Sequence, residues 1–317
     1  MIKMKFLIIG LGNIGLRHIQ GLSKLKSNIS FYLFDKKKEY LINYQNEINE
    51  IKKNHKVYNI SNYDDIFSLK KIDLIIISTT AKGRALILNK LRKFFPDTKI
   101  VIEKPICQSI YELNKLKKIQ ENTYVNHPFR YNKWFIKIKK EFLKDYKGSS
   151  FNMVVKAPKL GLGCNACHFI DLFHFFTNLF PTKVIAKKMN WIKSKRIDFD
   201  EVDGILEIYF GSKHKLIINS ISKGIVNENI VIEGKSKTLK FIIDFDNKIC
   251  KFNNYNTIPG RLLYQSECSN ILFKNIKNNK NITNLKDAIK LFKLTLMSMV
   301  NSWNKSFKTN KRKINIT

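Results

Sequence analysis

The sequence predicts an α/β protein of two domains: a doubly wound parallel sheet, followed by an α/β domain with an open, largely antiparallel sheet. Up to about residue 122, short apolar runs alternate with amphipathic helical patterns, as a parallel sheet covered by helices requires. Beyond that point the strand-like segments alternate apolar and polar side chains, which is typical of a sheet with one packed face. A chain of 317 residues is long enough to bury two cores. We therefore expect domains at 1–122 and 123–317.

The order of elements follows from hydrophobic periodicity. In the first domain we expect strands at 5–9, 29–34, 57–58, 73–79, 99–102 and 123–125, with helical segments at 37–51, 63–69, 81–95 and 109–120. In the second domain we expect helices at 130–146, 165–179, 261–278 and 285–303, and strands at 202–210, 216–220, 229–233 and 239–243. Ser109 is the expected N-cap of its helix.

A glycine-rich turn follows the first strand and has the spacing of a dinucleotide-binding βαβ unit. Gly10 permits the tight strand-to-helix turn, and Gly12 has no Cβ to block the approach of a pyrophosphate. Gly15 lets the helix pack close to the strand, while the helix N-terminus offers N–H groups and partial positive charge to the phosphates. The first domain is therefore expected to have a Rossmann fold.

The second strand ends in Asp35, twenty residues after Gly15. An acidic side chain there accepts hydrogen bonds from both ribose hydroxyls and repels a 2′-phosphate, which favours NAD. The lysines at 36–38 could attract that phosphate, so NADP is not excluded. The alternative is an ordinary loop Asp after a generic strand.

The net charge of +33 raises the question of a nucleic acid or an anionic membrane as partner. Only 7 of the 58 basic residues are Arg, whereas base readout favours Arg, and the lysines are spread over most of the predicted helices. We expect most of them on solvated faces and no specific nucleic-acid binding. The one dense basic stretch, at 305–313, is a candidate for salt-sensitive contact with anions.

Targeting signals and cysteine content indicate the compartment. The N-terminal residues lead at once into the glycine turn and show no signal-peptide pattern, and no apolar run reaches the ~18 residues of a membrane span. Five cysteines, an odd number, do not suggest a disulfide framework. We expect a cytoplasmic protein.

Four motifs, in order and separation, resemble the Gfo/Idh/MocA family of NAD(P)-dependent sugar oxidoreductases over nearly the full chain. They are the glycine turn at 10–15, Glu-Lys-Pro at 103–105, Asn-His-Pro-Phe-Arg-Tyr-Asn at 126–132 and His-Phe-Ile-Asp-Leu at 168–172. The resemblance implies a Rossmann domain, then an open sheet that often forms the oligomer interface, and hydride transfer at a carbon of a sugar, cyclitol or nucleotide sugar. The form of the motif at 126–132 is most similar to members that act on nucleotide-linked or acidic sugars in surface-polysaccharide synthesis.

The resemblance and the chemistry together suggest site residues. Oxidation of a secondary alcohol needs a hydride acceptor, a base and a charge that stabilises the developing alkoxide. We expect Lys104 and His168 to be catalytic, Lys104 also to contact the cofactor, and no metal ion to take part. The other expected cofactor contacts are Gly10, Gly12, Asn13, Ile14, Gly15, Asp35, Ser78, Thr79 and Glu103. The expected substrate contacts are His127, Arg130, Tyr131 and Asn165.

Three of these residues also have a purely structural interpretation. Lys104 could be a surface lysine in a turn, His168 a core histidine and Arg130 part of an ion pair on a helix. Asp171, one helical turn beyond His168, is interpreted as a structural or orienting residue and not as a catalytic one.

The chain departs from the family pattern one helical turn before His168. Many members carry an Asp there, whereas this chain has Cys164 followed by Asn165. Either Lys104 and His168 suffice, or the chemistry differs, or activity is absent. The segment 164–168 also spells CxxCH, a haem-attachment pattern, which we interpret as incidental because it merges into an apolar helical run and no export signal is present.

The expected function is therefore hydride transfer between NAD and a sugar or nucleotide sugar by a homo-oligomer. The alternative is a redox-inactive ligand-binding or regulatory protein on the same fold, which would bind without changing NADH absorbance.

Overall fold

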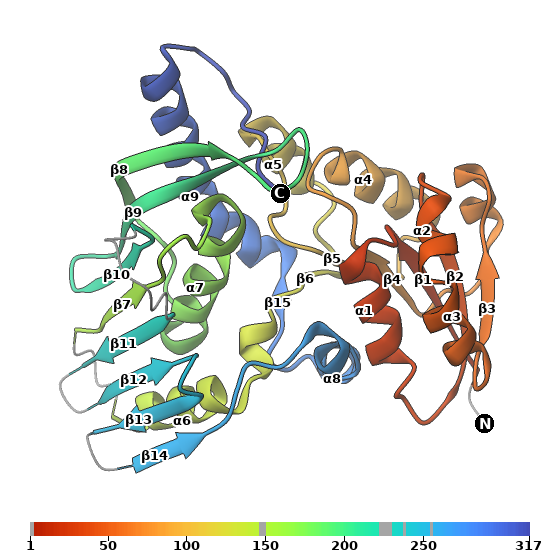
Figure 1. The fold of residues 1–317 in the computed structure, drawn as a ribbon, viewed down its shortest axis with the longest axis horizontal. Helices are drawn as coiled ribbons and strands as arrows, with labels where there is room; N and C mark the ends of the chain where they lie inside the picture. Colours follow the sequence, from red (N-terminus) through yellow and green to blue (C-terminus); the bar gives the residue numbers. More distant parts are fainter. Residues whose placement is uncertain (1–2, 146–149, 222–229, 237–238, 254–255) are drawn as a thin grey trace. The chain divides into compact units, whose positions relative to one another are not determined.

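The computed structural model describes residues 3–145, 150–221, 230–236, 239–253 and 256–317. The chain forms two compact units, each of which is described by itself (Figure 1). The first unit comprises Met1–Cys107, Glu112–Pro128 and Leu263–Lys286, and the second comprises Gln108–Tyr111, Phe129–Leu262 and Asp287–Thr317. Leu263–Lys286, late in the sequence, thus joins the first unit.

The first unit is built on a seven-stranded sheet in the order β15-β6-β5-β4-β1-β2-β3. All neighbouring strands are parallel except β15, which runs antiparallel to β6. The strands are β1 Lys3–Ile9, β2 Asn28–Phe34, β3 Lys56–Asn59, β4 Leu74–Ile77, β5 Lys99–Ile102, β6 Thr123–Val125 and β15 Thr283–Asn284. The expected doubly wound sheet is confirmed.

Helices connect and cover these strands. They are α1 Asn13–Leu22, α2 Glu39–Asn43, α3 Gln45–Lys52, the 3-10 helix η1 Tyr63–Ser68, α4 Arg84–Phe94, α5 Ile110–Leu116 and α8 Gln265–Lys277. The helix expected at 37–51 is divided into α2 and α3. α8 packs on the sheet through Phe273, whose ring centroid lies 5.0 Å from that of Phe6 on β1.

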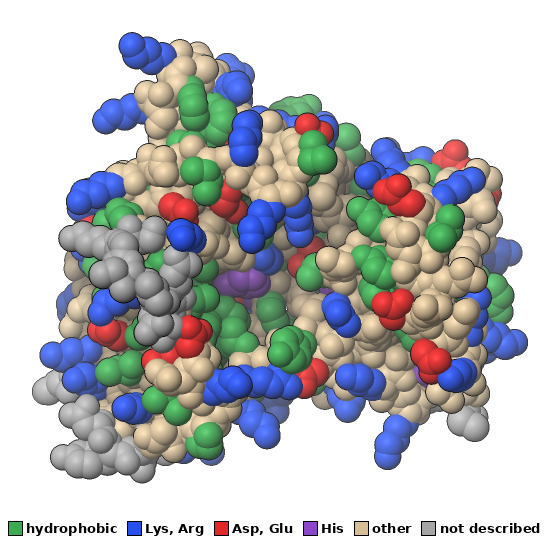
Figure 2. Space-filling view, in the orientation of Figure 1, with side chains coloured by type: hydrophobic (Ala, Val, Ile, Leu, Met, Phe, Trp, Pro, Cys, Tyr) green, Lys and Arg blue, Asp and Glu red, His purple; other side chains and the backbone are tan. Residues whose placement is uncertain are grey.

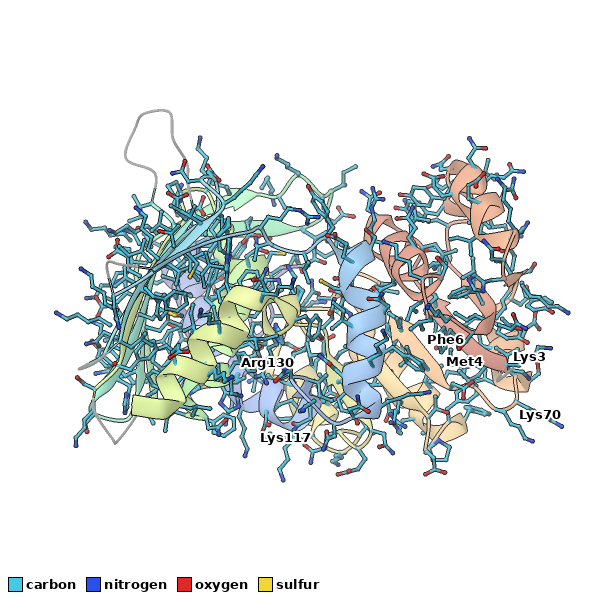
Figure 3. All side chains as sticks on the ribbon, turned by 90° about the horizontal axis from the view of Figure 1, so that it is seen from below. Lys3, Met4, Phe6, Lys70, Lys117 and Arg130 are labelled. Atoms are coloured by element: carbon cyan, nitrogen blue, oxygen red, sulfur yellow. The ribbon has the colours of Figure 1, made fainter. Side chains whose placement is uncertain are left out.

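The core strands are apolar because helices cover the sheet. All four residues of β4 are fully buried, as its unbroken apolar pattern predicts. β1 begins with an exposed Lys3 and then buries Met4 and Phe6, which are labelled in Figure 3.

The second unit contains an eight-stranded sheet in the order β14-β13-β12-β11-β7-β10-β9-β8. Among the described strands, the β7–β10 pair is parallel and the other neighbouring pairs of this sheet are antiparallel. The strands are β7 Asn152–Lys156, β8 Lys183–Lys193, β9 Asp200–Phe210, β10 His214–Asn219, β11 Val231–Lys235, β12 Lys240–Asp244, β13 Ile249–Phe252 and β14 Asn256–Pro259. The expected largely antiparallel sheet is confirmed.

The helical segments in the described part of this unit are η2 Pro128–Tyr131, α6 Lys133–Asp145, α7 Leu162–Thr177 and α9 Leu285–Phe307. Tyr146 and Asn229, the expected ends of two elements, lie outside the described residues. The core between α7 and the sheet is rich in Phe, and Phe173 stacks on Phe210 with ring centroids 4.2 Å apart. β9 buries Leu206, Ile208 and Phe210 on alternate positions, as its pattern predicts.

Several strands of this unit escape sequence analysis: β7, β8, β13 and β14. β8 is an edge strand with Lys at positions 183, 187, 188 and 193, and only one flank of an edge strand pairs. Because of this polar composition, the sequence pattern does not predict that β8 is a strand.

The basic stretch at 305–313 is folded onto the second unit. α9 extends to Phe307, Lys313 forms an antiparallel bridge with Ser109, and the Ile314 N–H donates to the Gln108 carbonyl at 3.2 Å. Figure 2 shows Lys and Arg scattered over the visible surface of both units. Among the described residues, no helix is long and apolar enough to cross a membrane.

Candidate cofactor and substrate sites

The turn after β1 requires glycine at two positions. Gly10 has φ +95°, and a Cβ there would lie 2.6 Å from the Thr79 backbone nitrogen. A Cβ on Gly15 would lie 2.0 Å from the Gly10 carbonyl oxygen, so α1 approaches the strand as closely as the backbone allows. The turn therefore lies tightly against the C-terminal end of β4.

Gly12 has the opposite environment. Its φ of −60° and ψ of −178° are accessible to any residue, and no heavy atom lies within 4 Å of a Cβ built there. Gly12 is also the N-cap of α1, where no side chain caps the helix and no acidic residue occurs in the first turn. The space beside Gly12 thus adjoins backbone N–H groups and the positive end of a helix dipole, which suits a pyrophosphate.

Asp35 holds the glycine turn through its carboxylate. Oδ2 accepts a hydrogen bond from the Leu11 N–H at 2.6 Å, and Oδ1 accepts one from the Lys37 N–H at 2.8 Å. The residue remains half-exposed, and each oxygen has a second lone pair for a ribose hydroxyl. Lys37 pairs with Glu39 at 3.3 Å on the surface.

The remaining expected cofactor contacts surround the same turn. Asn13 and Ile14 are exposed on the first turn of α1, and Asn13 Oδ1 accepts a hydrogen bond from the Tyr44 hydroxyl at 2.6 Å. Ser78 Oγ donates to the Gly10 carbonyl at 2.7 Å, and Thr79 follows it at the end of β4. These side chains lie at the end of the first sheet where β1 and β4 have their C-termini.

Lys104 follows β5 and precedes a cis peptide bond to Pro105. The buried guanidinium of Arg84 donates hydrogen bonds to the carbonyl oxygens of Glu103, Pro105 and Thr79. Arg84 therefore joins the two loops that end β4 and β5 and fixes the backbone on both sides of Lys104. Sequence analysis missed Arg84; the only available signal was the rarity of Arg in a Lys-rich chain.

Glu103 lies in a buried polar network. Its Oε1 contacts His18 Nε2 at 2.9 Å and accepts a hydrogen bond from Asn126 Nδ2 at 2.6 Å. Asn126 Nδ2 also donates to Gln265 on α8, and Ser269 on the same helix lies 3.0 Å from His18 Nδ1. Burial raises the pKa of Glu103, but hydrogen bonding and charge from His18, with Asn126 and Lys104, lower the pKa overall. The network around the Glu103 carboxylate thus links α1, α8 and the ends of β5 and β6.

Arg130 and Asp171 form a buried bidentate ion pair in the second unit. Arg130 Nε and Nη2 donate to the two Asp171 carboxylate oxygens at 2.7 and 2.8 Å. The guanidinium carbon also lies 5.2 Å from the Phe175 ring centroid; Arg130 is labelled in Figure 3. Asp171 thus pairs with Arg130, and the alternative of an ion pair for Arg130 describes this contact, although the pair is buried. Tyr131, beside Arg130, is buried, as is His127 in the first unit.

α7 carries Cys164, Asn165 and His168 on its first two turns. His168 is 9% exposed, and its ring stacks on Phe129 with centroids 5.1 Å apart. Asn165 Nδ2 donates to the Leu160 carbonyl at 2.6 Å, and Asn165 is half-exposed. The helix arrangement puts Cys164 one turn before His168, so no carboxylate of α7 itself occupies that position.

Glu201 on β9 places a carboxylate at the start of α7. Its role was not predicted from the sequence. Its Oε1 accepts a hydrogen bond from the Gly163 N–H at 2.7 Å, at the start of α7. Burial raises the pKa of Glu201 to about 7, Asp203 adds to the rise, and backbone N–H groups of Val202, Gly163 and Cys164 oppose it.

The expected residues fall into two groups. The first unit holds all the cofactor contacts together with Lys104 and His127, and the second unit holds Arg130, Tyr131, Asn165 and His168. Among the described residues, no three His, Cys, Asp or Glu side chains gather as metal ligands.

The fold and the glycine turn define a dinucleotide-binding protein. Residues 4–126 match the Gfo/Idh/MocA model, an oxidoreductase family with an NAD-binding Rossmann fold. The resemblance is thus confirmed over this N-terminal segment. No curated protein sequence matches the chain.

Solved structures share the fold over nearly the whole chain. The WlbA dehydrogenase from Bordetella pertussis, in complex with NADH and UDP-GlcNAcA, is 15% identical with a TM-score of 0.73, covering 96% of each chain. A myo-inositol dehydrogenase from Corynebacterium glutamicum is 16% identical with a TM-score of 0.68, covering 94% of this chain and 96% of its own. Biliverdin reductase from Synechocystis, in complex with biliverdin and NADP+, is 12% identical with a TM-score of 0.68, covering 93% and 98%. At these identities the likeness establishes the fold.

Proposed function

We propose that this protein is a cytoplasmic oxidoreductase that transfers a hydride between NAD and a sugar or nucleotide sugar. The observation that carries the proposal is the open space beside Gly12 at the uncapped N-terminus of α1. There the backbone N–H groups would hold the pyrophosphate, and Asp35 would accept hydrogen bonds from the adenosine ribose. When bound, the nicotinamide supplies the hydride acceptor or donor.

Two residues of the protein would take up the hydroxyl proton of the substrate and stabilise the negative charge on its oxygen. His168 would accept the hydroxyl proton in the oxidation direction, because imidazole exchanges protons near neutral pH. Lys104 would donate a hydrogen bond to the substrate oxygen and favour the developing alkoxide. The preference for sugars is supported by WlbA, solved with UDP-GlcNAcA, and by the inositol dehydrogenase, two proteins with this fold.

Arg130 enters this proposal as a residue that arranges the substrate side. Its ion pair with Asp171 occupies Nε and Nη2, so a substrate carboxylate or phosphate would meet an arginine already held in place. His127, Tyr131 and Asn165 complete the proposed substrate contacts. A role in surface-polysaccharide synthesis is part of the proposal, and its support is the form of the motif at 126–132, which is most similar to family members of that kind.

The first test is equilibrium binding of NADH and NADPH by fluorescence. We expect saturable binding that favours NADH in the wild type. Asp35→Asn should shift the ratio of the two affinities toward NADPH, because it removes the charge that repels a 2′-phosphate. A purely structural role of Asp35, which holds the Leu11 N–H, would weaken both cofactors equally and leave the ratio unchanged.

The second test is turnover of a panel of UDP-sugars and free sugars, followed by NADH absorbance. Lys104→Met and His168→Ala should each lower kcat by orders of magnitude while far-UV circular dichroism stays unchanged. A variant that kept wild-type turnover would remove that residue from the mechanism.

A second candidate function is ligand binding without redox chemistry. It is favoured by Cys164 and Asn165, which put no carboxylate one turn before His168. NADH binding together with unchanged absorbance across the sugar panel would support this alternative.

The homo-oligomer is also part of the proposal. It rests on the family resemblance, which implies that the open sheet of the second domain often forms the oligomer interface. Sedimentation that gives a monomer at micromolar concentration would contradict it.

A further inference from the structure

The five cysteines divide sharply by environment. Cys107, Cys250 and Cys268 are each 0% exposed. Burial raises the pKa of the Cys250 and Cys268 thiols to about 12. Because the thiolate is the reactive form, Cys250 and Cys268 are protected from oxidants by both burial and protonation, and Cys107 is protected by burial.

Cys164 and Cys167 differ from the other three because both are half-exposed. They lie three residues apart on the first two turns of α7, which begins at Leu162. The Cys167 thiol donates a hydrogen bond to the Cys164 carbonyl at 3.3 Å, so the second sulfur lies over the turn that holds the first residue. Residues three apart lie on the same face of a helix, so the two cysteines share one face of the first two turns.

The helix brings this pair within reach of a bridge. Helical rise and radius give a Cα–Cα separation of about 5 Å for residues three apart, and disulfides span roughly 4.4–6.8 Å. Cβ atoms at this spacing are about 5–6 Å apart, whereas a disulfide prefers roughly 3.5–4.5 Å. Closure therefore requires the first turn of α7 to tighten by about 1–2 Å.

Residues packed against the first turn of α7 would be disturbed if that turn tightened. Glu201 accepts hydrogen bonds from the Gly163 and Cys164 N–H groups, which fix the first turn. A Cβ on Gly163 would lie 2.7 Å from both Glu201 Oε1 and Ile316, so this turn is closely packed. A bridge that tightens the turn must alter these contacts, next to Asn165 and one turn before His168. A bridge formed against such contacts is easily reduced.

We propose that Cys164 and Cys167 form a reversible disulfide that reshapes the start of α7 under oxidising conditions. A low-molecular-weight disulfide is the oxidant. One cysteine thiolate attacks it, releasing one thiolate and forming a mixed disulfide. The second cysteine thiolate then displaces the other half, and the two released thiolates take up the two protons lost by the cysteines. Two electrons pass from the protein to the small disulfide.

Metal ligation is a weaker explanation for the same motif. The described residues contain no group of three or more His, Cys, Asp or Glu side chains that could hold a metal. Two thiols with an adjacent histidine on one helix therefore favour redox chemistry, which needs only the two sulfurs.

The test uses the full chain, incubated with oxidised glutathione, quenched with an alkylating agent and analysed by intact and peptide mass spectrometry. We expect loss of two alkylatable thiols, a 164–167 bridge in the peptide map and full reversal by dithiothreitol. Cys164→Ser should instead leave a glutathione adduct on Cys167, and Cys167→Ser an adduct on Cys164. Cys107→Ala is the matched control and should form the bridge as the wild type does.

A second readout reports the conformational consequence. Hydrogen exchange at the Gly163 and Cys164 amides should become faster in the oxidised protein, because their bonds to Glu201 are disturbed. The proposal is overturned if both thiols stay alkylatable in excess oxidised glutathione, if each carries its own adduct, or if the bridge joins two copies of the chain. Unchanged amide exchange in a fully bridged sample would overturn the reshaping of α7. None of these readouts depends on NAD binding or turnover.

Discussion

Gly12→Ala should separate the cofactor site from the stability of the fold. Gly12 already has φ −60°, and nothing lies within 4 Å of the added methyl group. Alanine therefore meets no strain in the protein. It reduces the freedom of the unfolded chain, worth about 0.4–1 kcal/mol, but it is a poorer N-cap of α1 than glycine, by about 0.5–1 kcal/mol. We expect these effects to offset each other and the free energy of unfolding to stay within about 1 kcal/mol of the wild type. The same methyl group fills the space where we expect the pyrophosphate.

The cost to binding follows from overpacking. Forcing a methyl group into a closely packed contact costs about 1–3 kcal/mol, which is roughly a 5- to 150-fold rise in Kd at 1.4 kcal/mol per factor of ten. NADH fluorescence titration measures the Kd, and urea unfolding of the same sample measures stability. NADH binding equal to that of the wild type, in a stable Gly12→Ala protein, would refute the assigned pyrophosphate position.

Gly15→Ala is the matched comparison. Its Cβ would lie 2.0 Å from the Gly10 carbonyl oxygen, so α1 must move by roughly 1 Å to reach the contact distance of real Cβ atoms. We expect lower stability, by about 1–3 kcal/mol or more, together with weaker NADH binding. If the two variants lost stability equally, the distinction between open and packed glycines would be wrong.

Three further predictions concern buried charges. Arg84→Met removes the donor shared by three carbonyl oxygens and should lower the free energy of unfolding by about 3 kcal/mol in urea; an unchanged midpoint would contradict that role. Replacing Arg130 or Asp171 singly with an uncharged residue should cost about 3–5 kcal/mol each, and the double variant should cost much less than the sum if the ion pair is their main role. Burial raises the pKa of Glu201 from 4.5 to about 7. Between these two pH values the folded protein keeps the Glu201 carboxyl protonated while the unfolded chain does not, so the free energy of unfolding falls as pH rises from 4.5 to about 7. Glu201→Gln lacks that loss and should gain up to about 3 kcal/mol on the wild type between pH 5 and 8; parallel pH profiles would refute this.

The parts of the protein that sequence analysis anticipated depend on local chemistry. The turn at 10–15 requires backbone close to backbone, and only glycine permits the contacts at Gly10 and Gly15. Asp35 occurs where β2 ends, and the buried strand β4 is a continuous apolar run. Each of these features lies within a few neighbouring residues, and so the glycine turn, Asp35 and the parallel strands β1 to β6 were predictable, whereas β15, late in the sequence, was not.

Tertiary structure decided the partnerships between distant residues. His18, Glu103, Asn126 and Ser269 meet in one network although 251 positions separate its ends in the chain. Nothing local in those segments specifies such contacts, because a buried polar group accepts any partner that packing brings within hydrogen-bonding distance.

The same limit explains the other features that sequence analysis missed. The Arg84 bridge, the Arg130–Asp171 pair and the Glu201 bond to α7 all join segments that the strand order brings together. The lysine-rich edge strand β8 follows the same rule, since its extended structure depends on pairing with β9. Sequence determined the local backbone and the glycine turn of this protein; long-range packing decided which buried charges face one another and which strands complete its sheets.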